Sequence, residues 1–149
     1  MTFELRSALS SPDISVRMDA VERLTQKPDV ARPLVVGLLL APDTPVLARV
    51  WAMLTICLIK DDSRELAARA LVEVMHAEGG IVRRCAIETL GDLEVAWAAA
   101  EIAAHLTDHE PIDGGWFDDS STPSQAARRV LESIGTAEAV RLLAEHGGR

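Results

Sequence analysis

The sequence predicts an all-α fold, and three observations support that prediction. Alanine, leucine and valine dominate the 149 residues, whereas aromatic residues make up only 3% of them, a balance that suits closely packed helices better than sheets. Apolar residues reach 48% of the chain, which is enough to build a buried core. A short motif also recurs along the sequence. We therefore expect a single helical repeat domain over residues 1–149.

The recurring motif places an arginine shortly before an alanine, with an aliphatic residue one helical turn further on. Its alanines are Ala20, Ala52 and Ala86, which lie 32 and then 34 residues apart. A fourth copy aligns at Ala127, where Ser124 replaces the arginine. Each copy predicts one pair of helices, which gives about eight helices in total. The expected units are 1–41, 42–77, 78–107 and 120–149, and an inserted loop at 108–123 makes the last unit irregular.

In the first unit, Asp13 is a favourable N-cap for a helix. The apolar face of that helix is formed by residues at helical spacing, namely Ile14, Met18, Val21 and Leu24. Residues 27–29, Lys-Pro-Asp, end the helix. A second helix is expected from Leu34 to Leu40, with Pro33 tolerated only in its opening turn.

The other units follow the same plan of two helices each. The second pairs 46–59 with 63–76, the third pairs 82–90 with 95–106, and the fourth pairs 124–134 with 137–146. One such pair cannot bury its apolar face alone, so we expect the pairs to stack into a continuous core.

The arginine-alanine motif and the period near 33 residues resemble HEAT repeats. The most similar variety is the short HEAT-like repeat of phycobilisome lyases. The resemblance implies an α-solenoid of about four stacked antiparallel helix pairs, whose second helices line a concave surface. It also implies a non-catalytic scaffold or adaptor that binds a protein or peptide there. Two alternatives from the same family stay open: a lyase or chaperone-like enzyme acting on phycobilins, and a nucleic-acid-binding protein.

The residues that face outward from the second helices are the candidate binding residues. In the second unit, Leu66, Ala70 and Val74 fit the core, and in the third, Ala98, Ile102 and Leu106 do so. The outward positions are then Glu65, Arg69, Glu73, Trp97, Glu101 and His105. The motif arginines Arg17, Arg49 and Arg83 are expected to bind acids or helix ends of the adjacent unit, with contact to a ligand as the alternative.

The inserted loop contains Trp116 and Phe117 beside Asp118 and Asp119. Insertions in repeat proteins often lie at a binding face, and aromatic residues often dominate binding energy. The loop is therefore either a recognition element or a plug in which the two aromatic side chains fill the core.

No residue pattern points to catalysis. The sequence has no nucleophile motif and no phosphate-binding loop. His105 and His109 could clasp a metal from one helix, but a helix ending near Leu106 would separate them, so we expect surface histidines and neither metal nor cofactor.

The net charge favours a protein partner, and the N-terminal residues favour a cytoplasmic location. The net charge is −8, which repels phosphate backbones and makes a basic partner more plausible than nucleic acid. Neither a signal peptide nor a membrane span is expected. The use of 13 arginines with no asparagine suggests a bacterial source. Self-association through Phe3, Leu5 and Leu9 stays open, unless these residues pack inward on the first unit.

Overall fold

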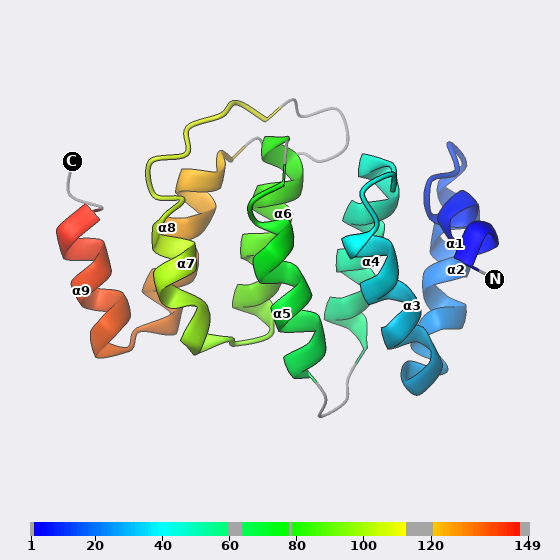
Figure 1. Cartoon of the computed structure of the whole chain (residues 1–149), viewed down its shortest axis with the longest axis horizontal. Helices are drawn as coiled ribbons and strands as arrows, with labels where there is room; N and C mark the ends of the chain where they lie inside the picture. The colour runs from blue at the N-terminus through cyan, green and yellow to red at the C-terminus, as the bar shows by residue number, and fades with distance from the viewer. Residues whose placement is uncertain (1, 60–63, 78, 113–120, 147–149) are drawn as a thin grey trace. The chain divides into compact units, whose positions relative to one another are not determined.

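Every regular element in the described part of the chain is helical in the computed structural model (Figure 1). The structure describes residues 2–59, 64–77, 79–112 and 121–146, with side chains from residue 4 onward. The structure divides into two compact units, Met1–Val74 and Met75–Arg149. From here on, the first and second unit mean these two parts of the chain and not the four predicted repeats. The predicted all-α fold is confirmed. Within the described ranges there are nine α-helices and one 3₁₀ turn, one α-helix more than expected.

The first unit is built from five helices. They are α1 (Thr2–Leu9), α2 (Ile14–Thr25), α3 (Pro28–Leu40), α4 (Val46–Leu58) and α5 (Arg64–Val74). Helix α4 packs against α1, α2 and α3, and α3 also packs against α5. Leu9 of α1 is fully buried, so this residue packs inward.

Helix α2 begins as predicted but faces a different way. The Asp13 carboxylate accepts the Ser15 backbone N–H at 2.9 Å, which confirms the N-cap. Ile14 and Met18, expected in the core, are exposed, and that prediction was wrong. The less exposed face runs instead through Arg17, Ala20, Val21 and Leu24. The motif arginine and alanine therefore lie on the packed side of the helix.

Helix α3 starts earlier than the sequence suggested. Pro28 occupies its first turn, where a missing backbone N–H costs nothing. Pro33 consequently lies inside the helix and not in its opening turn, which corrects the prediction. Pro33 is exposed. Pro28 and Asp29 of the predicted helix stop, and residues 30–32 that the prediction assigned to no helix, thus belong to α3.

The second unit contains the remaining elements. They are α6 (Gly80–Asp92), the 3₁₀ turn η1 (Ala96–Ala98), α7 (Ala99–Ala103), α8 (Pro123–Ile134) and α9 (Ala137–His146). Helix α8 packs against α6, α7 and α9, and α7 packs against α9. The helix expected over 95–106 is therefore a 3₁₀ turn followed by a short α-helix.

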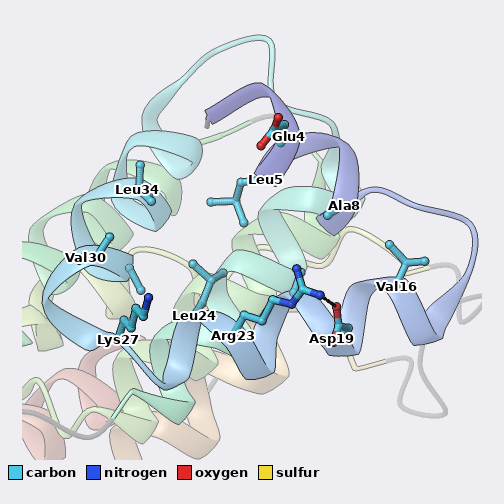
Figure 2. Close-up of a pocket in the computed structure, with 12 residues that line it drawn as sticks. Glu4, Leu5, Ala8, Val16, Asp19, Arg23, Leu24, Lys27, Val30 and Leu34 are labelled. Atoms are coloured by element: carbon cyan, nitrogen blue, oxygen red, sulfur yellow. Dashed lines mark ion pairs between the residues drawn. The ribbon is translucent and has the colours of Figure 1, made fainter.

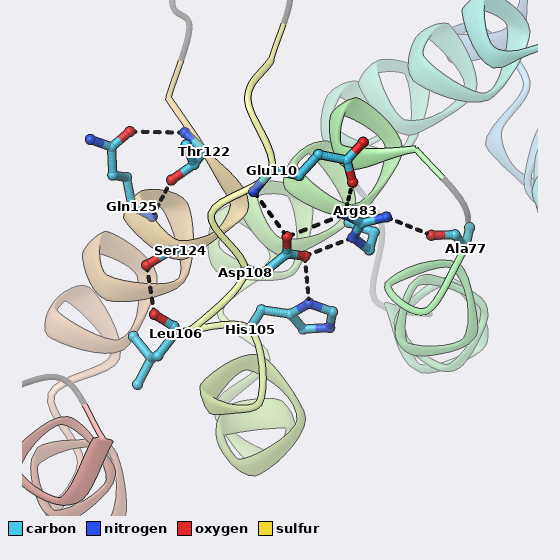
Figure 3. Close-up of polar contacts among 9 residues, drawn as sticks. All are labelled: Ala77, Arg83, His105, Leu106, Asp108, Glu110, Thr122, Ser124 and Gln125. Atoms are coloured by element: carbon cyan, nitrogen blue, oxygen red, sulfur yellow. Dashed lines mark hydrogen bonds and ion pairs between the residues drawn. The ribbon is translucent and has the colours of Figure 1, made fainter. Parts of the chain in front are cut away.

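Close packing of α6 on α8 depends on a glycine. A Cβ atom at Gly91 would lie 2.8 Å from Val130 Cγ2, nearer than side-chain atoms approach each other. Helix α8 itself begins with a capping box, in which Thr122 and Gln125 each bind the other's backbone N–H (Figure 3). The irregular fourth copy of the motif is therefore a well-defined helix packed closely on the third.

Candidate functional site

The three motif arginines share one structural arrangement. Each guanidinium donates to a backbone carbonyl just beyond the end of the preceding helix, and the pairs are Arg17 with Ser11, Arg49 with Ala41, and Arg83 with Ala77. Carbonyl groups at helix ends lack partners within the helix, and an arginine there supplies a donor to them. The Ala41 carbonyl also accepts the Thr44 backbone N–H at 3.2 Å. The motif arginine therefore fixes the turn that leads into its own helix.

Ser124 performs the same task in the fourth copy, where the arginine is missing. Its hydroxyl donates to the Leu106 carbonyl at 2.6 Å (Figure 3). Its backbone N–H donates to the Asp108 carbonyl at 2.8 Å. Both acceptors lie just after α7. The fourth copy thus keeps the turn contact with a shorter side chain.

Arg83 makes additional contacts to two acids. It donates to the Asp108 carboxylate at 2.7 and 3.2 Å and also pairs with Glu110. These hydrogen bonds hold the pKa of the Asp108 carboxyl and that of Glu110 below their usual values, and raise the pKa of Arg83. The segment after α7 is therefore tied to the start of α6.

His105 belongs to the same cluster of charged residues and is its most buried member. Its side chain was expected on the surface, yet the residue is only 7% exposed, so that prediction was wrong. Its Nδ1 lies 3.4 Å from Asp108, and its ring centroid lies 5.6 Å from that of His76. The chain turns inward beyond Ala103, where α7 ends, and carries His105 with it. Burial lowers the pKa of His105, which favours a neutral ring.

No metal site is formed by the candidate histidines. His109 is exposed while His105 is buried, so the pair does not share a helix face. Within the described ranges, no group of three possible ligands is close enough to hold a metal ion.

The other candidate binding residues are distributed over both units. Trp97 is exposed on η1 and Glu101 is half-buried on α7, both in the second unit. Arg69 and Glu73 are exposed on α5 in the first unit, where Arg69 pairs with Glu65 at 3.1 Å. Leu66 was expected in the core but is 51% exposed, so that prediction was wrong.

The aromatic loop lies outside the described residues. Trp116, Phe117, Asp118 and Asp119 all fall within 113–120, which the structure does not describe. The choice between a recognition element and a core plug stays a prediction.

A hollow in the first unit is the strongest candidate for a binding site. It lies between α1, α2 and α3 and encloses about 460 Å³ (Figure 2). Its walls are apolar and are formed by Leu5, Ala8, Val16, Ala20, Leu24, Val30, Ala31 and Leu34. Its rim carries Glu4, Asp19, Arg23 and Lys27. We call this feature the α1–α3 hollow.

Two of the four charged residues on the rim pair with each other, and the other two do not. Asp19 and Arg23 form an ion pair with each other at 3.1 Å. Glu4 and Lys27 have no ion-pair partner among the described residues, and Figure 2 shows them on opposite sides of the apolar walls. The hollow therefore combines an apolar interior with one uncompensated charge of each sign.

A second, more open hollow lies between α2 and α4. Its apolar residues are Met18, Val21, Trp51, Leu54 and Leu58, and Asp19 and Glu22 lie on its edge. The Arg17 guanidinium lies 4.9 Å from the centroid of the Trp51 ring, an arrangement that holds the tryptophan by a cation–π contact. This surface is open to solvent, and its lining includes no free cation of the described chain.

The sequence interpretation missed the α1–α3 hollow because its walls come from three helices. Lys27 was interpreted only as part of a helix stop, and Val30 was assigned to no helix. The available signal was the run from Val30 to Leu40, whose exposed positions carry no charge.

Comparison with known proteins identifies no family or relative for this chain. No helix in the described ranges is long and apolar enough to cross a membrane. The chain matches no protein-family model and no curated protein in sequence.

Proposed function

We propose that this chain is a non-catalytic adaptor of the HEAT-like kind, which binds a protein partner in the bacterial cytoplasm. The motif period and the repeated turn contacts of its arginines support the repeat assignment. On this proposal the helix pairs stack as a short solenoid. Arg69 and Glu73 in the first unit, and Trp97 and Glu101 in the second, are further candidate contacts for the partner.

The α1–α3 hollow is the observation that carries the proposal. Its apolar walls face an open space of about 460 Å³, the size of a typical binding pocket. Apolar surface left in water costs about 25 cal/mol per Å² compared with burial. An apolar centre with a charged rim is also the usual anatomy of a protein interface. A partner that covers the hollow gains this free energy.

A protein partner fits the charges better than nucleic acid does. The chain carries a net charge of −8, and phosphate binding requires several unpaired cations on one face. At the hollow, Arg23 is already paired with Asp19, which leaves Lys27 alone. One cation beside one free carboxylate favours a polypeptide that presents both signs of charge.

Site-specific photo-cross-linking in cells tests this proposal. A photoreactive residue at Val30, which lines the hollow and is exposed, should form an adduct with a discrete protein. Val140 on α9 is a matched control, because it is an exposed valine in a helix of the second unit. Filling the hollow by Ala8→Trp should abolish the adduct at Val30 while circular dichroism shows unchanged helix content.

Two results would count against the proposal. The first is an adduct at Val30 that survives Ala8→Trp, since binding would then not require the hollow. The second is an equal yield of adducts at Val140, which would indicate non-specific contact.

A further inference from the structure

We infer that the occupant of the α1–α3 hollow is an amphipathic α-helix, which lies along α3 and carries basic residues on one flank and acidic residues on the other. This inference rests on the proposed function and specifies the chemistry of the partner. Three features of the first unit support it: an uncharged strip on α3, a glycine within that strip, and two unpaired charges on the rim of the hollow.

The first feature is the uncharged exposed face of α3. Between Val30 and Leu40 the exposed positions are Val30, Pro33, Gly37 and Leu40, which recur every three or four residues and so lie on one face. Val30 and the half-buried Leu34 also line the hollow. The hollow therefore opens onto an uncharged strip that follows α3 from Val30 to Leu40, which we call the α3 strip. A surface of this shape suits a partner helix with apolar residues at matching spacing.

The second feature is Gly37, which lies in the middle of this strip. It is exposed, and a Cβ atom built on it would meet no other atom within 4 Å. Packing within the first unit therefore does not require a glycine here, although glycine is less favourable in a helix than alanine. A bare backbone on an exposed helix face allows close approach of a second helix. Gly91 differs in this respect, because its partner Val130 lies in the same unit.

The third feature is the pair of free charges on the rim. Glu4 on α1 and Lys27 between α2 and α3 lie on opposite sides of the apolar walls (Figure 2). Neither has an ion-pair partner among the described residues. A helix in the hollow would present one flank to each, so a basic residue facing Glu4 and an acidic residue facing Lys27 complement both.

Three synthetic helical peptides test the inference. All carry leucine at the spacing of the α3 strip, and their two flanks are both lysine, both glutamate, or one of each. Binding of the fluorescein-labelled peptides to the full chain is measured by anisotropy at about 0.15 M salt, where distant charges are screened. The wild type should bind the mixed peptide roughly tenfold more tightly than either of the others.

Variants of the rim should change this preference in a defined way. Glu4→Lys leaves two unpaired cations on the rim beside the Asp19–Arg23 pair, so it should favour the all-glutamate peptide. Lys27→Glu leaves two unpaired carboxylates there, so it should favour the all-lysine peptide. Glu132→Lys on α8 alters the net charge as Glu4→Lys does but lies in the second unit, and it should keep the wild-type order.

Gly37 provides a test that does not depend on charge. Gly37→Leu should weaken binding of the mixed peptide roughly tenfold, and Gly37→Ala should weaken it less. Ala100→Leu, at an exposed position of α7, should have no effect. Circular dichroism verifies that each variant stays folded.

The inference is overturned if the mixed peptide fails to bind, if the rim variants leave the order of peptides unchanged, or if Gly37→Leu binds like the wild type. It is also overturned if sedimentation shows that a second copy occupies the strip and Gly37→Leu dissociates the dimer. In each case a cross-link at Val30 that Ala8→Trp abolishes would still support the proposed function.

Discussion

Replacing Arg83 by glutamine removes the contacts that tie the segment after α7 to the start of α6. The guanidinium donates twice to Asp108 and once to the Ala77 carbonyl, and its side chain is 15% exposed. A hydrogen bond to a charged group contributes about 1.5–3 kcal/mol. The contact to Glu110 adds less, because that carboxylate is exposed. Glutamine replaces the guanidinium by a single uncharged amide group, so we expect Arg83→Gln to lower the free energy of unfolding by about 2–4 kcal/mol.

Two other arginines provide matched controls for this substitution. Arg49 donates once to a neutral carbonyl at 2.8 Å, so Arg49→Gln should cost about 1–1.5 kcal/mol. Arg141 pairs with Glu145 on the exposed face of α9, so Arg141→Gln should cost about 0.5 kcal/mol or less. Urea unfolding followed by far-UV circular dichroism measures all three. The order of cost should be Arg83, then Arg49, then Arg141.

A double-mutant cycle separates the Arg83–Asp108 contact from the others. Asp108→Asn alone and combined with Arg83→Gln should give a coupling free energy of about 1–3 kcal/mol. Our reasoning would be refuted if Arg83→Gln cost no more than Arg141→Gln, or if the cycle showed no coupling.

Two further predictions concern glycine packing and acid stability. Gly91→Ala should lower the free energy of unfolding by about 1–3 kcal/mol, because the added Cβ would collide with Val130 of α8. Gly37→Ala should raise the free energy of unfolding by about 0.5–1 kcal/mol, because no atom lies near the added Cβ. The urea midpoint should therefore decrease for Gly91→Ala and increase for Gly37→Ala. Folding lowers the pKa of Asp108 from its ordinary value of 3.8 through the hydrogen bonds with Arg83, and lowers the pKa of His105 from its ordinary value of 6.5 through burial. The unfolded chain therefore binds more protons, and stability should fall as pH drops below 6.5 and again below 3.8. Urea midpoints that do not change between pH 7 and pH 3 would contradict this, and Arg83→Gln should reduce the second decline.

The helical elements were largely predictable because local signals determine them. Asp13 lies before an apolar run and is a side-chain cap in the structure. The alanines at 52, 86 and 127 recur with the motif, and all three are fully buried. Small residues at one helical position allow close packing whichever helix is the neighbour, so the sequence alone identifies them.

Contacts between distant residues were not predictable in the same way. Leu66 and Met18 are apolar and lie at helical spacing, yet each is exposed, because the packed face of a helix depends on its neighbours. His105 was placed on the surface because the segment after Ala103 was read as a continued helix. The contact of Arg83 with Asp108 spans 25 residues, and no local pattern encodes it.

The α1–α3 hollow illustrates the same limit at the candidate site. Its walls combine side chains of three helices, and its rim joins Glu4 to Lys27, which are far apart in the sequence. Only the uncharged exposed positions of α3 could have been recognised from one segment. That signal was not recognised because the prediction placed a helix stop at Pro28 and began the next helix only at Leu34.

An NMR titration of the full chain with the mixed-flank peptide tests the central claim most directly. Backbone amide shifts report the residues whose environment changes when the peptide binds, even when binding is weak. We predict shifts concentrated at Leu5, Ala8, Val30, Leu34 and Gly37, with intermolecular contacts from the peptide leucines to the walls of the hollow. Shifts confined to α6–α9, or spread evenly over both units, would contradict the claim that the α1–α3 hollow binds the partner helix.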